Sequence, residues 1–175
     1  LKFATIKPLH KKGDKSDISN YRPIALLPTI NKIFERIICN RVQYFLDSNK
    51  INDKEQYGYK RNIGTNDAIL RFSHEITEHL DEGNAVVVIF MDLTAAFDTL
   101  NRDVLLEKLS HFGIRGHVNT LLSSYFSNRS QAVKIDDVVS SIAIIDEGVA
   151  QGSILSPILF NVNLYDSPPI SSQRI

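Results

Sequence analysis

One stretch of the chain decides the expected fold: AVVVIFMDLTAAFD, residues 85–98. Its first seven residues are continuously apolar and mostly β-branched, a composition typical of a strand buried on both faces. Gly83 and Asn84 supply a turn before it. The stretch therefore predicts a central strand over residues 85–91 that ends at Asp92. A carboxylate there must be paired, cap a helix or bind a cation, because an isolated buried charge is costly to desolvate.

Upstream of this strand the sequence predicts a hairpin and two amphipathic helices. Extended segments are expected over residues 3–9 and 21–27, with the polar residues 11–17 as the loop between them. Apolar residues then recur at helical spacing, first from Thr29 to Val42 and again from Thr65 to Leu80, with Thr65 as the expected cap. The stripe of the first helix consists of Ile30, Ile33, Phe34, Ile37, Ile38 and Val42.

Downstream, Asn101 is expected to cap a helix that Gly113 ends, and a second helical stripe covers residues 118–126. Residues 131–135 and 138–145 predict a β-hairpin around Asp136 and Asp137. A last helix should begin near Leu155, with Pro157 in its first turn. Helices and hairpins mix without regular βαβ alternation, which predicts the α+β class.

The bulk composition indicates one soluble globular domain, since 175 residues are 43% apolar and 23% charged. No apolar run approaches the roughly 20 residues that cross a bilayer, so we expect an intracellular protein, nuclear or cytoplasmic, with no membrane partner. The start at Leu1 and the polar end at residues 171–175 suggest a piece of a longer protein. Cys39 is expected to be a small buried hydrophobe, and the five histidines lack the spacing or cysteine partners of a zinc site.

The net charge of zero hides an uneven distribution. Residues 1–61 carry 13 Lys and Arg against 6 Asp and Glu, whereas residues 62–175 carry 7 against 14. A cationic segment beside an anionic one is typical of a site that grips phosphates on one side and holds divalent cations on the other. Solvated faces produce the same division, so the charge pattern leaves both interpretations open.

The carboxylate at the strand end suits one kind of chemistry. Phosphoryl transfer to a 3′-hydroxyl uses two metal ions about 3.5–4 Å apart, which stabilise the attacking and leaving oxygens. Mg²⁺ prefers carboxylate oxygens on a rigid support, and Asp92 would offer one. The alternative is that Asp92 or Asp98 caps the helix that follows.

Two motifs give the chain a family resemblance. Residues 92–98, followed by GVAQGSILSPILFN at 148–161, resemble two successive motifs of reverse transcriptases. Four upstream segments are similar to the fingers-region motifs of the non-LTR retrotransposon branch: KKGD at 11–14, YRPI at 21–24, KIFER at 32–36 and QYGY at 56–59. All occur in the family order and together span nearly the whole chain.

The resemblance implies a right-hand polymerase fold with fingers and a partial palm, truncated before the second catalytic aspartate motif. Residues 1–84 would form the fingers, and residues 85–99 the first palm strand with its metal-binding motif. Residues 100–150 would form helices and a hairpin between fingers and palm, and residues 151–175 the start of a palm helix.

The resemblance also implies roles for particular residues. Asp92 would bind both catalytic Mg²⁺ ions, with the backbone carbonyl of Leu93 assisting one of them. Phe97 would stand under the incoming sugar and exclude a 2′-hydroxyl. Cations of the fingers would close on the triphosphate: Lys11, Lys12 and Arg22. Gln151 and Gly152 would form the loop that packs on the nascent base pair.

Each of these positions has a plainer interpretation. Phe97 is also what an ordinary core phenylalanine looks like, and a Lys-Lys pair in a polar loop is usually solvated. Lys11 and Lys12 remain equivalent candidates for the triphosphate. Asp98 matches a family position too, where a helix cap or a structural hydrogen bond competes with a substrate contact.

The intact parent is expected to extend a DNA primer on an RNA template, using dNTPs and two Mg²⁺ ions. This chain departs from the family at Ala150, where proline is usual, and at Lys60, where arginine is usual. The aromatic-Ala-Asp-Asp motif occurs nowhere in it, so the chain alone is expected to be inactive. The alternatives are a group II intron-type reverse transcriptase and a non-catalytic nucleic-acid-binding relic. The oligomeric state is left open.

Overall fold

A computed structural model of the chain describes residues 2–51, 55–93 and 95–165. The elements follow in the order β1 (Phe3–His10), a short 3₁₀ helix η1 (Ile18–Asn20), β2 (Tyr21–Leu26), α1 (Thr29–Ser48), α2 (Thr65–Asp81), α3 (Arg102–His111), α4 (His117–Phe126), β3 (Arg129–Ile135), β4 (Val138–Val139), β5 (Ala143–Ile145) and α5 (Ser156–Leu164). The α+β class is confirmed. The tail after Tyr165, where the sequence shows no following strand, lies outside the described residues.

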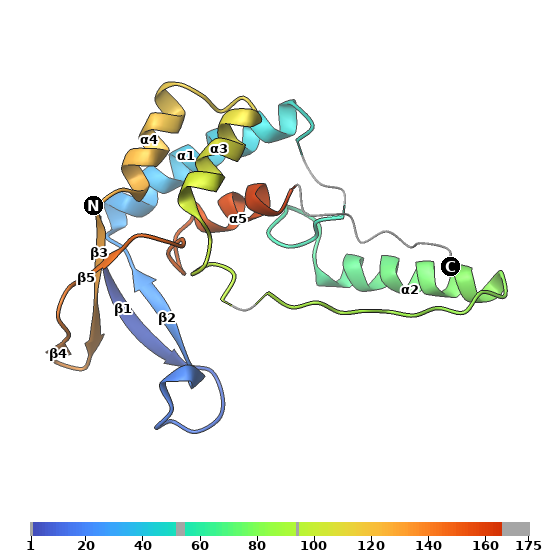
Figure 1. Cartoon of the computed structure of the whole chain (residues 1–175), viewed down its shortest axis with the longest axis horizontal. Coiled ribbons are helices and arrows are strands. Elements are labelled where there is room, and N and C mark those ends of the chain that lie inside the picture. The colour runs from blue at the N-terminus through green and yellow to red at the C-terminus, as the bar shows by residue number, and fades with distance from the viewer. Residues whose placement is uncertain (1, 52–54, 94, 166–175) are drawn as a thin grey trace.

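Four helices enclose the main core. In Figure 1, α1, α3, α4 and α5 gather into one body, and their fully buried leucines lie at its centre: Leu105, Leu109, Leu122, Leu155 and Leu159. Each such side chain stabilises the fold by roughly 2 kcal/mol through its removal from water. Cys39 is half-buried against this core, and burial raises the pKa of its thiol.

The local helix signals are confirmed where they depend on hydrogen bonds between near neighbours. The Asn101 side chain accepts from the backbone N–H groups of Asp103 and Val104, both at 3.0 Å. Gly113, with φ of +102°, ends α3 as expected. The expected cap of α2 is wrong by one residue, because Thr65 is already helical and its predecessor is the cap.

The buried face of α1 differs from the expected stripe. The residues turned inward are Asn31, Glu35, Ile38, Val42 and Leu46, whereas the apolar positions 30, 33, 34 and 37 are exposed. Helical spacing predicted the helix correctly, but the face that packs is rotated and brings two polar side chains into the interior.

The sheet has the order β2-β1-β3-β4, and β5 pairs with β3. β1 is antiparallel to β2 but parallel to β3, so the helices α1 to α4 lie within the crossover between two parallel strands. A small second core consists of Ala4, Ile6, Ala25 and Leu27. The outer half of the β1–β2 hairpin projects from the helical body, as Figure 1 shows.

The expected central strand over residues 85–91 is wrong. This segment is extended but belongs to no strand, and its side chains are largely exposed, with Val87 at 81% and Phe90 at 83%. It runs beside α2 (Figure 1), where the rings of Phe72 and Phe90 lie 5.7 Å apart. A strand buried on both faces needs hydrogen-bonded neighbours. In the described part of the chain, no strand of the sheet pairs with residues 85–91.

Candidate functional site

The two motifs that dominate the sequence lie side by side. The backbone N–H of Gly148 donates to the carbonyl of Leu100, and that of Val149 to the carbonyl of Phe97, both at 2.8 Å. Gly148 has a φ of +73°, and a Cβ there would lie 2.5 Å from the carbonyl oxygen of Asp98. Only glycine allows this close approach, so the second motif packs directly on the end of the first.

A side-chain hydrogen bond joins the same two motifs. The amide nitrogen Nε2 of Gln151 lies 3.3 and 3.1 Å from the two carboxylate oxygens of Asp98. Neither Asp92 nor Asp98 caps α3, since Asn101 does so. Of the interpretations open for Asp98, the structural hydrogen bond is the one observed.

The loop that carries Gln151 also lies along the free edge of β2. The backbone N–H of Ala25 donates to the carbonyl of Gln151 at 2.8 Å. Gly152 has a φ of +109°, and a Cβ there would meet the Ala25 carbonyl oxygen at 3.0 Å. The glutamine-glycine pair is thus fixed between the first motif and the hairpin. A cavity of about 250 Å³ adjoins it, lined among others by Pro23, Asp98 and Gln151.

Arg102 supports this loop from α3, and nothing in the sequence pattern singled it out. Its guanidinium donates to four backbone carbonyls, those of Phe126, Ile145, Glu147 and Gly148, at 2.7 to 3.0 Å. One side chain therefore ties the loop to β5 and to the end of α4.

Strand alternation places Lys11 and Arg22 on the same face of the β1–β2 hairpin. Arg22 faces Leu9 across the β1–β2 ladder, and the ladder continues one pair further through the Lys11 N–H to the carbonyl of Asn20. Side chains two residues apart share a face, which puts Lys11, Arg22 and Ile24 on one side. Lys12 lies in the bend that follows the ladder, where this alternation does not apply. A Cβ at Gly152 would lie 3.8 Å from the Cγ2 atom of Ile24. Arg22 is one step, about 7 Å, further along that face.

Phe97 packs among aromatic rings. Its ring is stacked on Phe160 at 4.8 Å and meets the edge of Tyr59 at 6.0 Å, and it is half-buried against the main core. A core residue and a residue that limits the space under a sugar would both be held in this way, so its role stays a prediction.

Asp92 and Leu93 lie on the exposed segment that follows Met91. The expectation of a desolvated carboxylate at a strand end therefore does not hold. Within the described ranges, no group of three or more His, Cys, Asp or Glu could hold a metal ion. A pair of Mg²⁺ ions needs several carboxylate oxygens, and the Asp92 carboxylate with the Leu93 carbonyl supplies only part of that set. Asp92 and Leu93 alone therefore supply too few ligands to hold the two Mg²⁺ ions.

Glu35 is the main feature that the sequence did not reveal. It is fully buried, and its carboxylate accepts from the hydroxyl of Tyr125 at 2.6 Å, the hydroxyl of Ser153 at 2.9 Å and the backbone N–H of Ile154 at 2.8 Å. Burial, and then the Glu35 charge, raise the pKa of Tyr125 well above its usual range. A polar residue one turn before the buried Ile38, on the same helix face, was the available signal.

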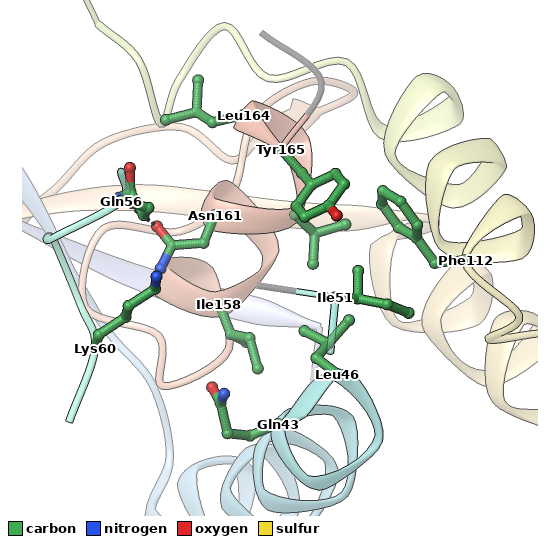
Figure 2. Close-up of a pocket in the computed structure, with 11 residues that line it drawn as sticks. Gln43, Leu46, Ile51, Gln56, Lys60, Phe112, Ile158, Asn161, Leu164 and Tyr165 are labelled. Carbon is green, nitrogen blue, oxygen red and sulfur yellow. Dashed lines mark hydrogen bonds between the residues drawn. The ribbon is translucent and has the colours of Figure 1, made fainter. Parts of the chain in front are cut away.

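A second hollow lies between α1, α5 and the segment around Gln56, and Figure 2 shows its lining. There Gln56 donates to Asn161 at 3.0 Å, and the rings of Phe112 and Tyr165 meet at 4.9 Å. With about 30 Å³ it has room for about one water molecule. It is a packing gap between the QYGY segment and α5, and none of the predicted site residues lines it.

Comparison with known proteins shows the family to which the chain belongs. The family described as "Reverse transcriptase (RNA-dependent DNA polymerase)" matches residues 9–173, and the chain belongs to that family. Within it, the chain is a partial domain of the non-LTR retrotransposon type.

Three relatives illustrate the similarity. The chain is 34% identical to the RNA-directed DNA polymerase from mobile element jockey of Drosophila melanogaster, and 30% identical to the probable RNA-directed DNA polymerase from transposon BS of the same species. Each match covers 95% of this chain but 18% of the relative. The Pol polyprotein from retrotransposable element R2 of Popillia japonica is 27% identical over 88% of the chain and 21% of its own length. Among the described helices, none has the length and hydropathy needed to cross a membrane.

Proposed function

We propose that this chain is the nucleotide-binding part of an RNA-directed DNA polymerase that extends a DNA primer on an RNA template with dNTPs. The observation that carries the proposal is the junction at Gln151, which is hydrogen-bonded to Asp98 beside Phe97 and to Ala25 of β2. Three motifs that are far apart in the sequence meet there, in the order and with the residue types of the family.

In this proposal the β1–β2 hairpin belongs to the fingers and α5 begins a palm helix. Lys11 and Arg22 are the proposed triphosphate ligands, because they share the hairpin face on which Ile24 approaches Gly152. The cavity beside Gln151 is lined by Pro23 and Ala25 of the opposite face. Arg offers two parallel donors to a phosphate and Lys a mobile charge. Lys12 lies in the bend beyond the ladder and is not part of the proposed contact. In the described ranges none of the three has a carboxylate within ion-pair distance.

Phe97 limits the space beside the sugar, and Gln151 with Gly152 forms the surface on which the nascent base pair rests. Gln151 can do this because one end of its amide is held by Asp98 while the carbonyl end remains an acceptor. The Asp92 carboxylate and the Leu93 carbonyl supply part of the ligands for two Mg²⁺ ions. Those ions would stabilise the attacking and leaving oxygens.

The 175-residue chain itself does not polymerise in this proposal, because the aspartate pair of the second catalytic motif is missing from it. Primer extension with Mg²⁺, dNTPs and an RNA template in excess tests this directly, and no extension is expected. Template-dependent incorporation that Asp92→Asn abolishes would contradict the proposed inactivity.

Nucleotide binding by the same chain is the measurement in which a positive result is expected. A fluorescent dNTP should bind weakly at low salt, and Arg22→Ala should weaken it while Lys12→Ala leaves it unchanged. The absence of any binding by the folded wild-type chain would overturn the nucleotide-binding assignment and leave the relic interpretation.

A further inference from the structure

A buried carboxylate on α1 holds the segment that directly follows the Gln151–Gly152 loop. One oxygen of Glu35 accepts from Tyr125 of α4, and the other accepts from both the hydroxyl of Ser153 and the backbone N–H of Ile154. Ser153 in turn accepts from the N–H of Leu155 through its hydroxyl. The turn that precedes α5 is therefore hydrogen-bonded to α1 through one side chain.

We propose that Glu35 is a positioning residue for the nucleotide-facing loop, acting through Ser153 and Ile154 without touching substrate. The inference rests on the proposed function of Gln151 and Gly152. It extends that function to a residue on another helix, 118 positions away from Ser153 in the sequence.

A carboxylate can accept from all three partners at once. A backbone N–H can only donate, and the two hydroxyls are both oriented as donors when they face an ionised carboxyl group, which only accepts. A glutamine at position 35 can keep its oxygen on Ser153 and Ile154 and turn its NH₂ group toward the Tyr125 hydroxyl, which can also accept, whereas an alanine leaves the Ile154 N–H and the Ser153 hydroxyl without this acceptor. A buried polar group left without its partner is costly, so the loop would shift away from α1.

The surroundings show how the buried charge is tolerated. In the described residues no Lys, Arg or His nitrogen lies within ion-pair distance of Glu35. The guanidinium of Arg129, which is 4% exposed, instead stacks over the Tyr125 ring at 4.7 Å. Tyr125 thus lies between a cation and the carboxylate to which it donates.

The loop is restrained on its other side by contacts that do not involve Glu35. Gly148 and Val149 donate to the backbone carbonyls of Leu100 and Phe97, and the Gln151 carbonyl accepts from Ala25. Loss of the Glu35 contacts should therefore loosen residues 152–155 locally, while the core leucines of α3 remain packed. This local pattern separates a positioning role from a general contribution to stability.

Amide hydrogen exchange of the full chain tests the proposal without any nucleotide. Glu35→Ala should speed exchange at residues 152–155 by about tenfold or more relative to Leu105 and Leu109, as expected for lost hydrogen bonds to a charged group. Glu35→Gln, which can keep an oxygen on Ser153 and Ile154, is the matched control and should give a smaller acceleration at the same residues. If Glu35→Ala does not fold, Glu35→Gln decides, with faster exchange confined to residues 152–155 still expected.

An equal acceleration of loop and core amides, or none, would overturn the proposal. In a second measurement, Glu35→Ala should weaken fluorescent dNTP binding by about tenfold while Glu35→Gln weakens it less. If the wild-type chain binds no dNTP, the proposed function fails, but the exchange result still decides whether Glu35 positions the loop.

Discussion

Gln151 donates from its side-chain amide to both carboxylate oxygens of Asp98, at 3.3 and 3.1 Å, across 53 residues of sequence. The contact joins the motif that ends in Asp98 to the loop on the edge of β2. It also restricts how Gln151 can present its remaining acceptor.

A double-mutant cycle measures this contact. Because the pair is largely exposed, Asp98→Ala and Gln151→Ala should each cost about 1 kcal/mol or less, with a coupling energy of about 0.5–1 kcal/mol. Urea unfolding of the two single variants and the double variant provides the values. Strictly additive effects would mean that the hydrogen bond contributes nothing to the fold.

The face of the β1–β2 hairpin that carries Lys11 and Arg22 should bind phosphates. Replacing both with Ala should lower the slope of log K against log salt for a single-stranded RNA oligonucleotide by about 1.4, at about 0.7 per phosphate contact. Filter binding at several salt concentrations gives the slope. Lys12→Ala is the neighbouring control, and an equal effect from it would refute the assignment by strand alternation.

Alanine substitutions at Gly148 and Gly83 distinguish steric crowding from backbone strain. Both have positive φ, +73° and +80°, but a Cβ would meet a backbone oxygen at 2.5 Å at Gly148 and open space at Gly83. We expect Gly83→Ala to cost about 1 kcal/mol and Gly148→Ala about 3 kcal/mol or more. Thermal unfolding compares them, and similar losses would show that the loop relaxes away from Asp98.

The raised pKa of Tyr125 has a consequence at high pH. A group whose pKa is raised by folding stabilises the protein below its unfolded value, here near 10, and that contribution is lost as pH rises further. The difference in unfolding free energy between wild type and Tyr125→Phe should therefore be constant from pH 7 to 9 and shrink above pH 10. Urea unfolding across this range measures it. A difference that grows with pH would contradict burial of the neutral phenol.

The exposed segment over residues 85–91 should tolerate a charge. Ile89 is 74% exposed, so Ile89→Asp should change the unfolding free energy by about 0.5 kcal/mol or less. Leu105→Ala, in the centre of the core, should cost about 2–5 kcal/mol. A loss of several kcal/mol from Ile89→Asp would show that this segment is packed as the inner strand that its composition predicts.

Much of the local structure follows from residues that are close in sequence. Asn101 caps α3, Gly113 ends it and Pro157 lies at the start of α5, because caps and turns depend on hydrogen bonds and φ angles within a few positions. The motif order likewise led to the family. These signals need no knowledge of what packs against them.

Burial is different, because it depends on which surfaces meet. The apolar composition of residues 85–91 predicts an inner strand, yet the neighbours that would bury it are not among the described strands, and the segment lies exposed beside α2. The parallel pairing of β1 with β3 and the inward face of α1 could not be predicted, since each depends on contacts with segments that are 90 or more residues away. The role of Glu35 has the same cause. Helical spacing places this carboxylate on the face of Ile38, but only the packing of α1 against α4 and the 153–154 turn gathers three donors around it.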